Sequence, residues 1–189
     1  RERHAFPTRR SSDLAVSWYF SRRVQRSISS VAKAVSEAEG WPLLALDTIK
    51  EAFFAHLGTG DRDYNRTLGK ASYQAIFALI ADFPPDAVAV VDAWFGFQPA
   101  EVLQDHLRRA GATQVVEVWC HAPAETIGER YRARLAERSP GHLGAAYIPE
   151  LIALAGAAGP LGAYPLFEVD TTRPLELAEL QRWLGRVFH

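Results

Sequence analysis

Short apolar runs alternate with segments of helical periodicity along this chain, and this alternation constrains the fold more than any other feature. The runs with the length and composition of buried strands are 42–46, 87–91, 114–119 and 166–169. Helical patterns occupy 29–39, 49–57, 65–81, 99–110, 123–136, 145–155 and the segment from about 175. Strands that alternate with helices form βαβ units, whose parallel sheet is covered by helices on both faces. The sequence therefore predicts an α/β fold with three layers, α/β/α, around a central parallel sheet.

Composition excludes several classes of function. The 189 residues are 48% hydrophobic and 23% charged, with a net charge of −1, so one domain can bury a sizeable core. A near-neutral chain gives no reason to expect nucleic acid or an anionic membrane as its main partner. No apolar run approaches the roughly 20 residues that a membrane span requires. The single cysteine, Cys120, excludes an internal disulfide and a cysteine metal cluster, and it favours a cytoplasmic setting.

Residues 1–26 differ in composition from the rest, with seven arginines against Glu2 and Asp13. A transit peptide or a basic arm that binds nucleic acid would have this composition. A third interpretation is that the stretch is not native, because residues 4–14 resemble translated sequencing-adapter DNA of the kind found in metagenomic fragments. We favour the third and expect a non-native or disordered leader over 1–26, then a single domain over 27–189. The chain contains no methionine, which also favours a fragment or a translated partial gene.

Aspartate follows three of the four apolar runs, as Asp47, Asp92 and Asp170. In open parallel sheets, ligands bind beyond the carboxyl ends of the strands, so these side chains would gather at one edge. An aspartate after a strand can instead cap the next helix. Three such residues in one chain shift the interpretation toward a binding site.

The segments 29–35, 41–50 and 88–95 (SSVAKAV, WPLLALDTIK and VAVVDAWF) carry a resemblance to a known family. In this order and spacing they resemble the P-loop kinases. Within these they are most similar to the small AAA-type ATPase/kinase group that includes chloramphenicol phosphotransferase-like and zeta-toxin-like enzymes. The resemblance spans about 28–188. It implies an ATP-dependent phosphotransferase that uses ATP and Mg²⁺ and acts on the hydroxyl of a small molecule.

The same resemblance implies roles for individual residues. Ser29 and Asp92 would hold Mg²⁺, with Ser29 and its neighbour Ser30 at the start of the helix that binds the nucleotide phosphates. Asp47 would face the acceptor hydroxyl as a general base or an orienting group, or else cap the helix that begins near residue 48. Asp170 and the following Thr171 would border the adenine, although a helix cap has the same sequence signature.

Arg130, Arg134 and Arg138 recur every four residues, so a continuous helix would present them on one face. They resemble the arginine-bearing lid of these kinases, in which case they would stabilise the transferred phosphoryl group. The alternative is a solvated face on which arginines pair with Glu129 and Glu137. Residues 53–70, with Gly58, Gly60, Asp61 and Asp63, are expected to contribute to the acceptor pocket.

The phosphate-binding loop of the family is missing. Its pattern, G-x-x-x-x-G-K-[ST], would place two glycines and a lysine at Arg22, Ser27 and Ile28, and all thirteen glycines lie at position 40 or later. Arginines in 22–26 add positive charge, but they cannot replace backbone N–H groups that wrap around a phosphate. The apolar run 15–20 stands where the family has its first, central strand. Two hypotheses follow: a kinase impaired by the lost loop, or a non-catalytic α/β module. The acceptor and the oligomeric state stay open.

Overall fold

The computed structural model describes residues 12–18, 28–94 and 98–188. Five parallel strands form one sheet in the order β2-β3-β1-β4-β5. The strands are β1 (Ser12–Trp18), β2 (Leu43–Ala45), β3 (Val90–Ala93), β4 (Ala112–His121) and β5 (Leu166–Asp170). The helices are α1 (Ile28–Glu39), α2 (Leu46–Leu57), α3 (Arg62–Ala81), α4 (Ala100–Ala110), α5 (Ala124–Ala133), α6 (Ile148–Ala157) and α7 (Leu177–Phe188), with short 3-10 helices η1 (Leu135–Glu137) and η2 (Ala145–Tyr147).

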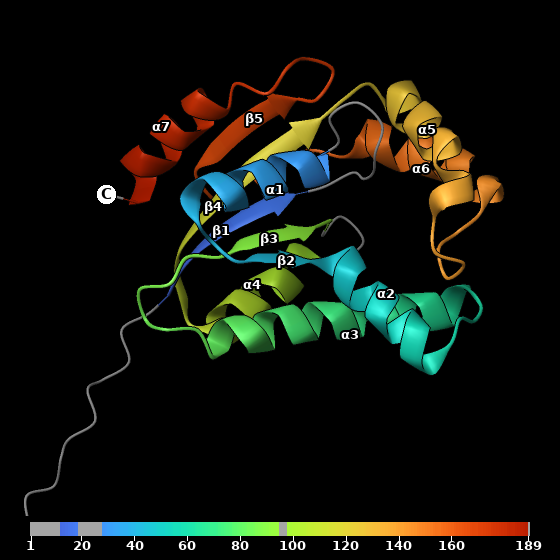
Figure 1. Ribbon diagram of the computed structural model, residues 1–189, viewed down its shortest axis with the longest axis horizontal. Coiled ribbons are helices and arrows are strands. Elements are labelled where there is room, and N and C mark those ends of the chain that lie inside the picture. The colour runs from blue at the N-terminus through green and yellow to red at the C-terminus, as the bar shows by residue number, and fades with distance from the viewer. Residues whose placement is uncertain (1–11, 19–27, 95–97, 189) are drawn as a thin grey trace, which may run out of the picture.

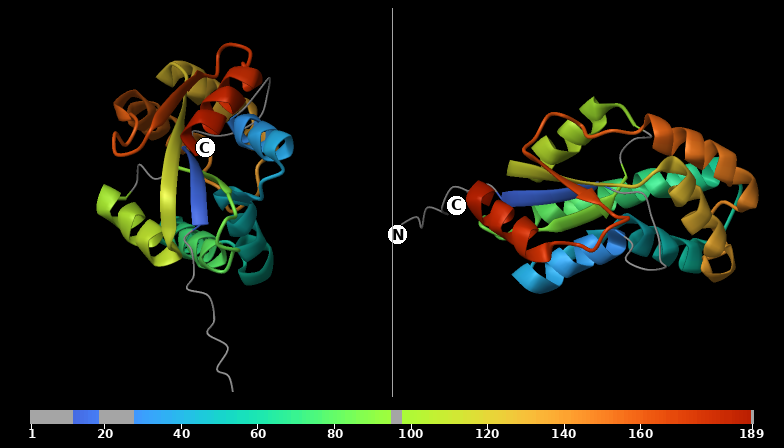
Figure 2. Two further views of the ribbon diagram at one scale, coloured as in Figure 1. Left: turned by 90° about the vertical axis from the view of Figure 1, so that its left-hand side faces the viewer. Right: turned by 90° about the horizontal axis from the view of Figure 1, so that it is seen from above.

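Helices cover both faces of the sheet (Figures 1 and 2). Helices α3 and α4 bury Ile76, Ile80 and Leu107 against one face, where they meet Val91 of β3. Helices α1 and α7 cover the other face, and their buried side chains meet the neighbouring Val90. Because successive side chains of a strand point to opposite faces, the continuous apolar run before Asp92 serves both layers. The predicted three-layer α/β/α fold is confirmed.

The central strand β1 lies inside the range that was predicted to be a leader. Its backbone pairs with β3 on one side, with Ser17 opposite Asp92, and with β4 on the other. The strand begins three residues before the apolar run 15–20 and ends at Trp18. Residues 12–18 therefore belong to the domain, and the predicted leader of 1–26 is wrong for this part. The arginine-rich composition of 1–26 favoured a leader, whereas the apolar run 15–20 had indicated the central strand that is observed here.

Several helix ends carry local sequence signals. Gly40, with φ of 70°, follows α1, and Gly111, with φ of 72°, caps α4 in the left-handed region that glycine adopts without strain. Asp61 caps α3, since its side chain accepts a hydrogen bond from the backbone N–H of Tyr64 at 2.8 Å. None of the helices in the described part of the chain is long and apolar enough to cross a membrane.

The end of the sheet where the strands finish is covered by a separate group of helices. Helices α5 and α6 pack together through Ile127, Tyr131, Ile148 and Leu151, beyond the carboxyl ends of the strands (Figure 1). Helix α2 and the first turns of α3 lie on the other side of the same sheet edge (Figure 1). These two groups of helices form the walls of the site.

Candidate active site

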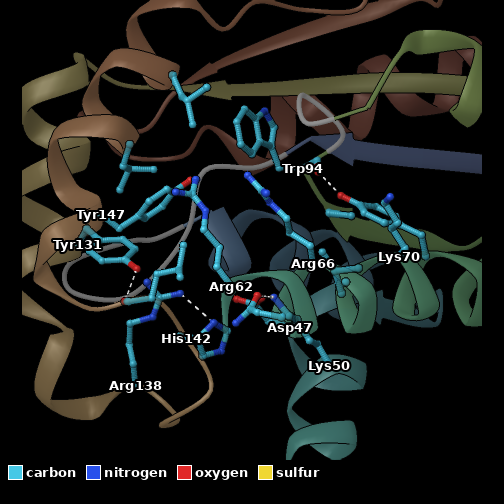
Figure 3. Close-up of a pocket in the computed structure, with 18 of the residues that line it drawn as sticks. Asp47, Lys50, Arg62, Arg66, Lys70, Trp94, Tyr131, Arg138, His142 and Tyr147 are labelled. Carbon is cyan, nitrogen blue, oxygen red and sulfur yellow. Dashed lines mark hydrogen bonds between the residues drawn. The ribbon is translucent and has the colours of Figure 1, made fainter. Parts of the chain in front are cut away.

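A cavity of about 560 Å³ opens between these walls (Figure 3). Its volume is in the range of sites for small ligands. Its residues come from α2, α3, the end of β3, the segment after α5, and α6. The predicted site residues that line it are Asp47, Asp92 and Arg138.

Asp47 and Asp92 lie on neighbouring elements at the same edge of the sheet. Ala45, the last residue of β2, pairs with Asp92 of β3, and Asp47 follows two residues later in the first turn of α2. Both carboxylates act on Tyr73: burial raises the pKa of this phenol most, and the negative charges of Asp47 and Asp92 raise it further. The Tyr73 hydroxyl donates to the carbonyl of Trp94. The expected convergence of these two aspartates is therefore observed.

The alternative role of Asp47 as a helix cap is wrong. Helix α2 begins at Leu46, directly after β2, and its N-cap position is Ala45, which makes no side-chain cap. Asp47 lies inside the first turn, where a carboxylate also interacts favourably with the helix dipole. Its position on the cavity wall leaves the carboxylate facing the space where a ligand would bind.

Ser29 and Ser30 lie in the first turn of α1, as expected, and their side chains fall outside the described residues. The strand that precedes α1 ends beside Asp92, because Ser17 of β1 pairs with Asp92 and Trp18 pairs with Ala93. The segment 19–27 between them, which holds the sequence in place of the phosphate-binding loop, also lies outside the described residues. The roles of Ser29 and Ser30 stay predictions.

The three arginines do not share one helical face. Helix α5 ends at Ala133, and Arg134 begins a separate 3-10 turn. Arg130 donates to the Thr171 hydroxyl at 2.8 Å and to the Thr171 carbonyl at 2.9 Å. Arg134 is 2% exposed and donates from Nε to the Arg130 carbonyl. Of the three, only Arg138 reaches the cavity, so the expected stripe is wrong, as is a solvated face at Arg134.

Asp170 and Thr171 support the turn after β5. Asp170 accepts hydrogen bonds from the backbone N–H and the hydroxyl of Thr172, and these bonds lower the pKa of the Asp170 carboxyl. Thr171 donates from its hydroxyl to the His121 carbonyl at 2.9 Å. Neither residue lines the cavity. Their contact with a nucleotide stays a prediction.

Arg138 is positioned by a chain of hydrogen bonds that the sequence did not suggest. Its guanidinium lies 4.2 Å from the centre of the Tyr131 ring and donates to Nδ1 of His142 at 3.1 Å. Nε2 of His142 lies 2.9 Å from a carboxylate oxygen of Glu51 in α2. Because a guanidinium can only donate, Nδ1 of His142 accepts, and Nε2 carries the proton toward Glu51. These two hydrogen bonds link Arg138 on one wall of the cavity to Glu51 of α2 on the other wall.

Helix α3 contributes the residues that sequence reasoning left unassigned. Arg62, Arg66 and Lys70 all line the cavity, and so does Lys50 of α2. The four-residue spacing of the three α3 residues was the signal that could have found them. Residues 53–70 do contribute to the pocket, as expected, but the wall is formed by these basic side chains with Asn65 and Gly69. The residues named in advance, Gly58, Gly60, Asp61 and Asp63, do not line it.

We predict that Gly141→Ala disturbs the wall that carries Arg138. A Cβ at Gly141 would lie within 2.6 Å of three atoms of the buried Phe54 ring, which in turn packs edge-on against His142 with ring centres 5.7 Å apart. Overpacking of this kind costs about 1–3 kcal/mol of stability. The measurement is the free energy of unfolding by urea, with Gly144→Ala as the control, because nothing lies within 4 Å of a Cβ at Gly144. Equal stability of the two variants would contradict the packing described.

Comparison with known proteins places this geometry in context. No sequence profile of a known family matches the chain, and no curated protein matches it. Among solved structures, a "putative kinase" from Chloroflexus aurantiacus J-10-fl superposes with a TM-score of 0.75 at 20% identity, over 94% of this chain and 99% of that one. A gluconokinase from Sinorhizobium meliloti 1021 gives a TM-score of 0.55 at 20% identity, over 96% and 93%. Shikimate kinase from Aquifex aeolicus gives 0.52 at 14% identity, over 92% and 96%. The chain has the fold of the small-molecule P-loop kinases.

A P-loop kinase fold implies a nucleotide and Mg²⁺, and the carboxylates of the cavity fit such a metal. Asp92 is 7% exposed and lines the cavity next to Asp47. Within the described ranges, no group of three or more His, Cys, Asp or Glu side chains could form a metal site of its own. Mg²⁺ needs no such cage, because it is commonly bound by one or two carboxylates together with water and substrate phosphates. Asp92, with Asp47 nearby, fits that donor set.

Proposed function

We propose that this protein is an ATP-dependent phosphotransferase that acts on the hydroxyl of a small molecule. The observation that carries the proposal is the convergence of Asp47 and Asp92 on one cavity at the carboxyl edge of the sheet. The sequence motifs around both residues favour the small AAA-type ATPase/kinase group with its chloramphenicol phosphotransferase-like and zeta-toxin-like members. The gluconokinase and shikimate kinase among the structural neighbours are by name kinases of small molecules.

In this proposal Mg²⁺–ATP, when bound, supplies the phosphoryl group. Asp92 and Ser29 hold the metal, and Asp47 orients the acceptor hydroxyl and accepts its proton. Arg138, held by His142, presents positive charge to the cavity where negative charge develops. Arg130 and Arg134 instead hold the segment after α5 in place. Ser30, Asp170 and Thr171 keep their proposed place on the nucleotide side, and the buried Cys120 favours action in the cytoplasm.

A second candidate is a non-catalytic α/β module. The observation that favours it is the lack of glycine and lysine upstream of Ser29, which leaves no phosphate-binding sequence in 22–28. Such a module would keep the fold and the cavity but would not bind ATP. Once the phosphate-binding loop is repaired, the two proposals predict different results for ATP binding and for transfer of the γ-phosphoryl group.

The test uses the chain with a repaired phosphate-binding loop and follows transfer of label from γ-labelled ATP to a panel of hydroxylated small molecules in the presence of Mg²⁺, with Asp92→Asn as the variant. We expect the variant to lose at least about 100-fold in kcat, because a neutral amide holds Mg²⁺ less tightly than a carboxylate. The matched control is Asp86→Asn, an exposed aspartate that does not line the cavity. A chain that transfers label to no acceptor, even after repair of its phosphate-binding loop, would favour the non-catalytic module.

A further inference from the structure

The wall of the cavity that α3 forms is strongly basic. Arg62, Arg66 and Lys70 stand one helical turn apart and all line the cavity. Figure 3 shows Arg62 and Arg66 extending from α3 into the cavity, toward the level of Tyr147 and Trp94. Like charges at this spacing destabilise a helix by a few tenths of a kcal/mol per pair. A ligand with negative charge would remove that cost.

The charges that line the cavity do not balance. Five lysine and arginine side chains face three carboxylates among the described residues, a surplus of two positive charges. The whole chain, in contrast, has a net charge of −1. The basic residues are Lys50, Arg62, Arg66, Lys70 and Arg138, and the acidic ones are Asp47, Asp92 and Glu150. Positive charge is therefore concentrated in the cavity.

The surplus lies on particular residues. Arg62 pairs with Glu150 of α6, which also lines the cavity, and Arg66 pairs with Asp63 at 3.3 Å. Lys70 has no carboxylate within ion-pair distance in the described part of the chain, and it is exposed to the cavity. Exposed pairs such as Arg66 with Asp63 are weak and can be exchanged for a ligand. Arg66 and Lys70 thus remain available to an anion.

Lys50 of α2 adds to the surplus of positive charge in the cavity. Burial lowers the pKa of its ammonium group, and the nearby charge of Arg138 lowers it further, while Asp47 opposes both effects. Its Nζ donates to Asn65 of α3, so Lys50 joins the two helices of this wall. A bound anion would offset the repulsion between Lys50 and Arg138.

The basic wall is separate from the helix that faces the nucleotide in the proposed kinase. None of residues 31–39 of α1 lines this cavity. Arg62, Arg66 and Lys70 belong to α3, on the opposite face of the sheet from α1 (Figures 1 and 2). An anion bound by α3 would therefore lie on the face of the sheet opposite α1, and in the proposed kinase this is the acceptor side.

We propose that the acceptor of this kinase is an anionic hydroxyl compound, with a carboxylate or phosphate group bound by Arg66 and Lys70 while its hydroxyl lies at Asp47. The inference rests on the proposed function for the role of Asp47, but the anion site itself does not. Arginine offers a carboxylate or phosphate two parallel donors, and lysine adds a point charge. The cavity of about 560 Å³ has room for a compound that spans from α3 to Asp47.

The test is calorimetric titration, without nucleotide, of three probes: D-gluconate, its neutral counterpart D-glucitol, and inorganic phosphate. We expect saturable binding of at least one anion and binding of gluconate at least about 10-fold tighter than of glucitol. The double variant Arg66→Gln/Lys70→Gln should weaken anion binding at least about 10-fold. The control, Arg109→Gln, removes an exposed arginine of α4 that pairs with Asp105 away from the cavity, and it should leave binding unchanged.

The results of the titration and of the transfer assay decide between the anionic acceptor and its alternatives. If neither anion binds saturably, or if the double variant binds anions as tightly as the unaltered chain, the anionic acceptor is overturned. Preference for gluconate over phosphate identifies a carboxylate site, and the reverse preference identifies a phosphate site. Anion binding without phosphoryl transfer by the chain with a repaired phosphate-binding loop would retain this site and reject the kinase. Transfer to neutral and anionic acceptors with equal kcat/KM would retain the kinase and reject the anionic acceptor.

Discussion

Asp47→Asn is expected to lower kcat for phosphoryl transfer by about 10²–10⁴-fold, which is the usual contribution of a positioned general base. Asparagine has nearly the same shape as aspartate, so the first turn of α2 and the cavity wall keep their packing. It cannot accept the acceptor's proton, and it presents an amide where the hydroxyl needs a carboxylate. Because Asp47 faces the acceptor in the proposed function, the affinity for ATP should change little.

The measurement is steady-state kinetics with nucleotide binding measured in parallel, in a chain with a repaired phosphate-binding loop. The control is Glu101→Gln, since Glu101 is the acidic residue in the first turn of α4 and does not line this cavity. This control separates the loss of a general base from the loss of a carboxylate that favours the helix dipole. Transfer at the original rate by Asp47→Asn would remove Asp47 from the chemistry.

The layers of the fold and the meeting of Asp47 with Asp92 could be predicted from the sequence, because both depend on local patterns. Apolar runs of strand length identify the buried sheet, and the end of a parallel strand is a defined edge. Around these two residues the structure moved only the element boundaries: Asp92 lies within β3, and α2 starts before Asp47.

The prediction that three arginines share one helical face was wrong for a physical reason. A spacing of four places Arg130, Arg134 and Arg138 together only if the helix continues, and α5 stops at Ala133. The buried Arg134 then turns back to the carbonyl of Arg130. Local contacts of this kind, between a side chain and a carbonyl at the end of its own helix, leave no periodic signal in the sequence.

The basic wall of α3 could not be assigned from the sequence either. Periodicity predicts that Arg62, Arg66 and Lys70 share a face, but charged faces usually point to solvent. Here α5 and α6 cover the end of the sheet opposite this face, so it borders a cavity (Figure 1). Contacts between elements that are distant in sequence, such as that of Arg62 with Glu150, determine whether this face of α3 borders a cavity or solvent.

Restoring the phosphate-binding loop is expected to raise the affinity for ATP at least about 100-fold. The change is Arg22→Gly, Ser27→Gly and Ile28→Lys, which recreates the pattern G-x-x-x-x-G-K-S directly before and at the start of α1. Glycines let the backbone N–H groups approach the phosphates, and the lysine adds a charged donor. Hydrogen bonds to charged groups contribute about 1.5–3 kcal/mol each, so two of them account for a gain of this size.

Titration with ATP and Mg²⁺ of the unaltered and repaired chains measures this gain, and we expect weak or no binding by the unaltered chain. The control replaces the same three residues with alanine, which removes the original side chains without adding glycine or lysine. If only the glycine–lysine variant gains affinity, the glycines and the lysine of the loop together are the missing element, because both variants lose the same arginine, serine and isoleucine. Tight binding by the unaltered chain would instead mean that arginines of 22–26 hold the phosphates without a glycine loop. An unchanged affinity after repair would place the nucleotide elsewhere and favour the non-catalytic module.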